Sequence, residues 1–133
     1  MVKQAQVFLL ALSFAVLGAL PASAQDFRAV NRVDVTPVDG GFQTADGAGF
    51  GARGMWCAAA DYARNALNAR SNARIYVVGL RQSFDAPVTF SLDQGGNDPK
   101  QVLILARSLR VAGANLSLAH AQGFCADVRL INR

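Results

Sequence analysis

The stretch Met55–Asn68 reads MWCAAADYARNALN, and its pattern is the main basis for the fold that we expect. Alanine is abundant and neither glycine nor proline interrupts the run, so the stretch favours a helix. Residues at helical spacing form one apolar stripe, made of Trp56, Ala60, Ala63 and Leu67, with Tyr62 beside them. Asp61 and Arg64 are three residues apart and close enough to pair at the edge of this stripe.

Runs typical of strands lie on both sides of this helix. Before it, alternating valines predict a strand over 33–38, and an Asp-Gly-Gly turn leads to a short return strand over 42–44. After it, Ile75–Leu80 is rich in β-branched residues and Val88–Leu92 alternates, so the two are predicted to form a hairpin. The run Val102–Ala106, VLILA, is predicted as a further strand.

The last segment fits two structures. Leu116–Ala121 alternates as a strand does, but Ser117 is a good N-cap and the residues after it are rich in alanine. We expect a short helix over about Leu118–Cys125. Together the elements predict an α+β fold: an antiparallel sheet of four to five strands packed against one main helix, with a short C-terminal helix and one disulfide.

The N-terminal residues are organised like a secretion signal. One basic residue, Lys3, precedes an uncharged apolar run over 7–20, and Pro21 and the small residues of 22–24 follow. This order is typical of a cleavable signal peptide, and the run is shorter than the ~20 residues of a membrane-spanning helix. We predict cleavage after Ala24, which leaves 25–133 as a single domain without a transmembrane segment.

Composition agrees with an exported bacterial protein. Arginine far outnumbers lysine, glutamate is absent, and alanine and glycine are abundant, a pattern typical of GC-rich bacterial genomes. We therefore expect a periplasmic or secreted protein. The net charge is +4, but the arginines are scattered and form no basic run with interleaved aromatic residues, which argues against a nucleic-acid partner.

Cys57 and Cys125 are the only cysteines, and in an oxidising compartment they are predicted to form one disulfide. A reactive thiol and a metal pair are the competing interpretations. No CxxC motif is present, and the single histidine, His120, does not complete a zinc site with two cysteines. We expect neither a metal nor a cofactor.

Residues 49–54 match G-x-G-x-x-G and lead into the predicted helix. A dinucleotide site would also need an acidic residue about 20 positions further on, where this chain has Arg74-Ile75-Tyr76. A smaller role stays open. Arg53 and the backbone N–H groups near Gly54 and Met55 are candidates for contact with a small anion or another ligand.

Two further groups of residues are candidates for function. Trp56 and Tyr62 would suit a recognition role if either were exposed. His120 with an aspartate would suit a small hydrolase or transferase, although no nucleophile motif accompanies it. The loop Asp93–Asp98 lacks the spacing and the distal glutamate of a calcium loop.

The chain resembles small exported proteins of α-proteobacteria whose activity is not known. The resemblance rests on Trp56–Ala63, on Arg74–Val78 and on Phe124-Cys125 near the C-terminus. It implies the same single domain and disulfide, and no activity. We therefore expect a non-enzymatic module that binds a periplasmic protein or an envelope component, with the hydrolase or transferase and a binder of anionic envelope components as alternatives.

Overall fold

The computed structural model describes Gly18 and residues 25–127. The predicted signal peptide, residues 1–24, lies outside the described residues except for Gly18, and so does its cleavage site. Among the residues that the structure describes, no helix has both the length and the apolar character to cross a bilayer.

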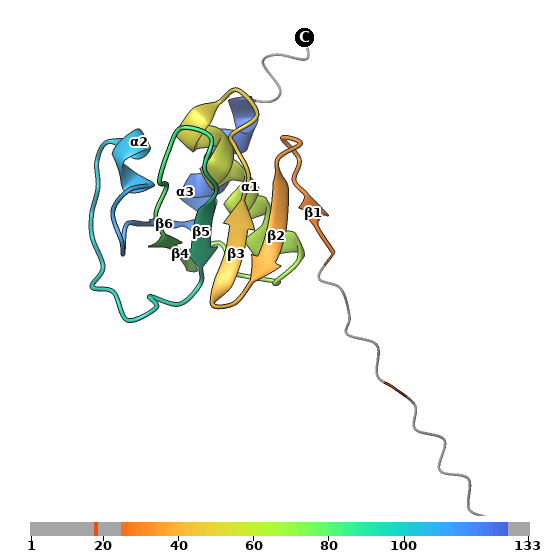
Figure 1. Cartoon of the computed structure of the whole chain (residues 1–133), viewed down its shortest axis with the longest axis horizontal. Coiled ribbons are helices and arrows are strands. Elements are labelled where there is room, and N and C mark those ends of the chain that lie inside the picture. The colour runs from red at the N-terminus through yellow and green to blue at the C-terminus, as the bar shows by residue number, and fades with distance from the viewer. Residues whose placement is uncertain (1–17, 19–24, 128–133) are drawn as a thin grey trace, which may run out of the picture.

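Six strands form one antiparallel sheet in the order β1-β2-β3-β5-β4-β6 (Figure 1). The strands are β1 (Phe27–Arg28), β2 (Asp34–Val38), β3 (Gly41–Thr44), β4 (Arg74–Gly79), β5 (Val88–Ser91) and β6 (Asn115–Ser117). The predicted α+β class and the hairpin of β4 and β5 are confirmed. The sheet has six strands rather than four to five, because β1 is two residues long and shows no periodicity, and because β6 lies in the segment for which we expected a helix.

The predicted strand over 102–106 is wrong. Residues 102–104 are not in a strand, and Leu105–Ser108 forms the short helix α2. The place beside β4 is taken by β6, which pairs with it from Arg74 to Tyr76. A continuous apolar run does not by itself distinguish a strand from a helix. In this fold the free edge of β4 is already paired with β6.

The main helix, α1, spans Gly51–Asn65 and lies across one face of the sheet. It begins four residues earlier than predicted because the chain folds back tightly at Gly47, whose carbonyl accepts a hydrogen bond from the Phe50 N–H. It ends three residues early. Asn68 takes a left-handed conformation with φ of 54°, which asparagine adopts more easily than most residues, and so turns the chain away.

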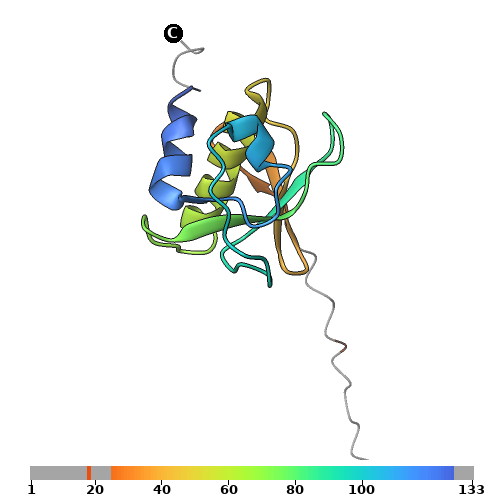
Figure 2. The same cartoon turned by 90° about the vertical axis from the view of Figure 1, so that its left-hand side faces the viewer.

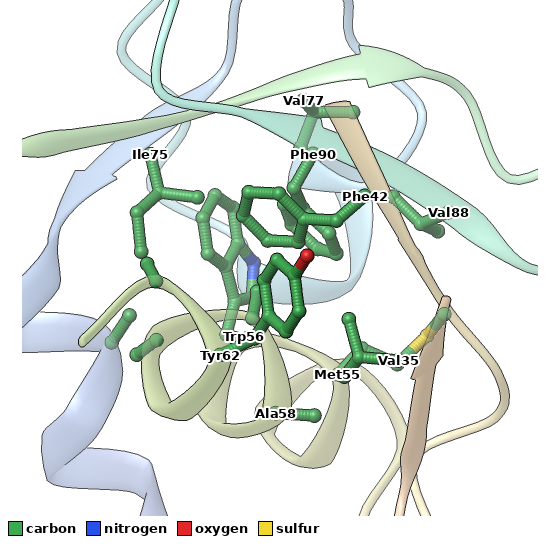
Figure 3. Packing of buried hydrophobic residues seen from close by; sticks show 14 of the residues in the cluster. Val35, Phe42, Met55, Trp56, Ala58, Tyr62, Ile75, Val77, Val88 and Phe90 are labelled. Atoms are coloured by element: carbon green, nitrogen blue, oxygen red, sulfur yellow. The ribbon is translucent and has the colours of Figure 1, made fainter. Parts of the chain in front are cut away.

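The core lies between α1 and the sheet (Figure 3). Trp56 and Tyr62 project from the helix toward the sheet, where Phe42 and Phe90 meet them. The centroids of the Trp56 and Phe90 rings are 4.9 Å apart in an edge-to-face arrangement, and those of Tyr62 and Phe42 are 4.8 Å apart. Aromatic rings at these distances add to the stability gained by burial, so this cluster fixes how the helix sits on the sheet.

The chain after β6 contains both structures that the sequence suggested. Ser117 ends the strand, and its hydroxyl accepts a hydrogen bond from the backbone N–H of His120, as an N-cap does. Helix α3 (Leu118–Gly123) follows, and a 3-10 turn, η1 (Phe124–Ala126), continues it. The expectation of a helix over 118–125 is therefore close to the structure.

The predicted disulfide between Cys57 and Cys125 is confirmed. It joins α1 to η1, and Figure 2 shows these two helical segments side by side. Because α1 begins at Gly51, Cys57 lies in its second turn, whereas the predicted start at Met55 would have put it in the first.

Gly54 is predicted to be intolerant of a side chain. A Cβ atom at this position would collide with the Gly47 carbonyl, which packs against the helix. Gly54→Ala should therefore lower the free energy of unfolding by about 1–3 kcal/mol, the usual cost of overpacking. Gly123→Ala in α3 is the matched control, because its Cβ would meet open space and should be neutral or slightly stabilising. Urea denaturation of both variants tests the difference, and equal effects would contradict it.

Candidate interaction surface

The residues considered for anion contact are engaged within the fold. The Arg53 guanidinium donates to both carboxylate oxygens of Asp127, at 2.7 and 3.1 Å, and lies over the Phe124 ring. Gly54 and Met55 are buried, and the Gly54 carbonyl accepts a hydrogen bond from the Asn31 side chain. Arg53 therefore contacts the C-terminal segment, Gly54 packs against Gly47 and Met55 belongs to the core, so the three residues form no open cradle.

The Arg53–Asp127 pair gives a pH-dependent prediction. The hydrogen bond from Arg53 holds the pKa of Asp127 below the ordinary aspartate value, despite partial desolvation that acts the other way. A depressed pKa means that the pair stabilises the fold at neutral pH and that this contribution is lost as the pH falls through the Asp127 pKa. An NMR titration should find Asp127 titrating below ~3.9, and Arg53→Gln should return it toward that value. An unchanged titration in the variant would contradict the prediction.

Trp56 and Tyr62 are placed in the core rather than at the surface. Trp56 is fully buried, and Tyr62 is only 7% exposed. Tyr62 lines a shallow cavity of about 360 Å³ at the end of α1, together with Phe42 and Leu92. A recognition role for Trp56 or Tyr62 required an exposed aromatic ring, and neither residue has one.

His120 is exposed, and its ring packs against Phe124 with 5.5 Å between centroids. Within the described part of the chain no aspartate forms a hydrogen bond with it, and no three metal-binding side chains gather. The structure therefore does not assemble the pair that a hydrolase or transferase built on His120 would need.

Asp61 and Arg64 do not form the pair that their spacing suggested. The Asp61 carboxylate accepts from the Val30 N–H at 2.8 Å and from the Asn65 side chain at 2.7 Å. Arg64 donates instead to Gln122 on α3. Asp61 is buried by the turn between β1 and β2, so it can satisfy a backbone donor there, and its role is to hold that turn on α1.

Exposed apolar side chains gather around α2. Leu103 is 89% exposed and Ile104 64% exposed, and both come just before the helix begins. Two adjacent large aliphatic side chains form a small contiguous apolar patch at the surface, which makes this segment the candidate contact site. We define the 100–110 patch by five residues: Lys100, Leu103, Ile104, Arg107 and Arg110.

The patch rests on a well-packed base. Val102 and Leu105 are partly buried and pack against the core, while Leu109 is fully buried. The indole N–H of Trp56 donates to the Ser108 hydroxyl at 2.9 Å, which ties α2 to the main helix. The structure thus holds Leu103 and Ile104 outward by anchoring the residues on either side of them.

The charged residues of the patch itself are all basic, and the nearest acid in sequence is Asp98, two residues before Lys100. Lys100 and Arg107 line a shallow cavity of about 340 Å³ beside Leu103 and Ile104, and its lining contains no carboxylate. The sequence from 99 to 126 contains no acidic residue. The two ion pairs of the described residues, Arg28–Asp34 and Arg53–Asp127, do not include Lys100, Arg107 or Arg110. The apolar side chains are therefore bordered by cations that are free to meet an anionic partner.

The sequence did not predict this surface because the run VLILA is typical of a strand. A signal was nevertheless present: the apolar run stands between Lys100 and Arg107 in a segment without acids. Apolar residues flanked by bases are typical of surfaces that contact anionic partners.

Comparison of the chain with protein-family models, with curated proteins and with solved structures found no match. The resemblance to small exported proteins of α-proteobacteria therefore stays an expectation, and function has to be argued from the surface itself.

Proposed function

We propose that this chain is a non-enzymatic, exported binding module that attaches to a component of the bacterial envelope through the 100–110 patch. The observation that carries the proposal is the exposure of Leu103 and Ile104 on an anchored base. Leaving two large aliphatic side chains in water forgoes about 1.5–3 kcal/mol for each that a buried position would gain. A partner that covers them recovers that free energy on binding.

Fractionation of cells that produce the full chain tests the proposal. The wild-type protein should sediment with washed envelopes, and Leu103→Ser/Ile104→Ser should leave it in the soluble fraction. Val30→Ser/Leu67→Ser is the matched control, since it removes two exposed apolar side chains elsewhere and should not change the distribution. A wild-type protein found wholly in the soluble fraction, or a double variant that sediments as before, would contradict the proposal.

A further inference from the structure

We infer that the component bound by the 100–110 patch is the surface of an anionic lipid bilayer, an inference that rests on the proposed function. The first argument is charge. Lys100 and Arg107 are exposed and line the shallow cavity beside Leu103 and Ile104, and Arg110 is exposed two residues after α2. The sequence from 99 to 126 contains no acidic residue. Basic residues at a surface are attracted by anionic headgroups, while apolar side chains beside them enter the boundary between headgroups and acyl chains.

The second argument is the form of the surface. Leu103 and Ile104 protrude from the start of a four-residue helix and do not line a deep groove. A standard protein–protein interface buries ~800 Å² on each partner, with matching shapes over that whole area. Two protruding aliphatic side chains supply only a small part of such an area. Insertion among lipids needs no matching surface, so the patch suits a bilayer better than a protein.

The third argument is a neighbouring loop with an apolar tip. Phe84, between β4 and β5, is 78% exposed. Arg81 holds this loop in shape: its guanidinium donates to the Phe84 carbonyl and lies against the Phe84 ring. The Arg81 N–H donates to the Leu109 carbonyl, so the loop is tied to the chain after α2, and Figures 1 and 2 show both at the same end of the molecule. The loop also carries Asp85, so it contributes an apolar contact and no net charge.

Sedimentation with protein-free vesicles tests the inference. Vesicles of equal parts phosphatidylethanolamine and phosphatidylglycerol should bind the protein, and vesicles of phosphatidylcholine alone should not.

Lys100→Gln/Arg107→Gln/Arg110→Gln should weaken binding by the order of 100-fold, because each cation near an anionic surface contributes about fivefold. Leu103→Ser/Ile104→Ser should weaken it about 100-fold or more, because neither side chain can then leave water for the acyl chains. Raising the salt from ~0.01 M to ~0.15 M should also reduce binding, since the screening length falls from ~30 Å to ~8 Å.

Matched controls separate this surface from general basicity. Arg32→Gln/Arg64→Gln/Arg70→Gln removes the same number of charges elsewhere and should bind almost as the wild type does. Circular dichroism of every variant establishes that the fold is retained. Equal losses in both triple variants would overturn the inference, because attraction would then not depend on the patch.

The vesicle and envelope experiments fail in different ways. A protein that sediments with envelopes through Leu103 and Ile104 but ignores anionic vesicles would overturn the lipid inference and leave the proposed function standing, with a protein or a polysaccharide as the partner. A protein that binds neither would overturn both.

Discussion

Loss of the Cys57–Cys125 disulfide is expected to lower the free energy of unfolding by about 4 kcal/mol. The bridge closes a loop of 68 residues, and a cross-link of that span removes much of the conformational entropy of the unfolded chain. Small domains are stable by only ~5–15 kcal/mol, so the reduced protein should unfold at a much lower urea concentration. The bridge also fixes η1 to the middle of α1, so its loss should loosen the C-terminal helices first.

The measurement compares oxidised and reduced wild-type protein with Cys57→Ala/Cys125→Ala. Reduced protein and double variant should have similar midpoints, and both should lie well below that of the oxidised protein. Alanine is the suitable replacement because Cys57 is fully buried and serine would place a hydroxyl in the core. Equal midpoints for the oxidised and reduced protein would show that the bridge adds no stability.

Trp56→Ala is expected to cost about 3–5 kcal/mol. The indole is fully buried, packs edge-to-face on Phe90 and donates a hydrogen bond to Ser108. Its removal leaves a cavity between α1 and the sheet and releases α2. Since the chain has one tryptophan, unfolding must be followed by circular dichroism. Leu67→Ala, at an exposed position, is the control and should change stability by ~0.5 kcal/mol or less.

Trp56→Phe separates the packing of the ring from its hydrogen bond. Phenylalanine keeps an aromatic ring against Phe90 but has no N–H group. The Ser108 hydroxyl retains a partner, since it also donates to the Leu105 carbonyl, so the expected cost is only about 1 kcal/mol. The Ser108 N–H donates to the Ile104 carbonyl and so forms the helical hydrogen bond of α2. Hydrogen exchange at this amide should nevertheless become faster. Unchanged exchange there would show that Trp56 does not hold the 100–110 patch in place.

The candidate surface depends on these same contacts. Leu103 and Ile104 lie at the end of the loop between β5 and α2. Their direction follows from Ser108, Leu109 and Val102 being held inward. Weakening of the Trp56–Ser108 hydrogen bond should therefore reduce both the stability of α2 and binding by the patch.

Several elements could be predicted because their signals are local. The alanine-rich run after Met55 contains the periodicity of α1, and the alternation of Val88–Ser91 contains that of β5. Ser117 indicates where α3 begins, because an N-cap needs only the three residues that follow it. With only two cysteines available, the pairing of Cys57 with Cys125 had one solution.

The features that the sequence did not predict depend on contacts between residues that are distant in sequence. VLILA became a surface segment because β6 had taken the place beside β4, and Arg53 was drawn to Asp127, which lies 74 residues away. Asp61 bonded to Val30 rather than to Arg64 for the same reason. Local patterns were enough to predict the main helix, the hairpin and the disulfide. Which apolar residues remain at the surface depends on tertiary packing. A local pattern identifies the apolar residues, but their burial depends on segments that are distant in sequence.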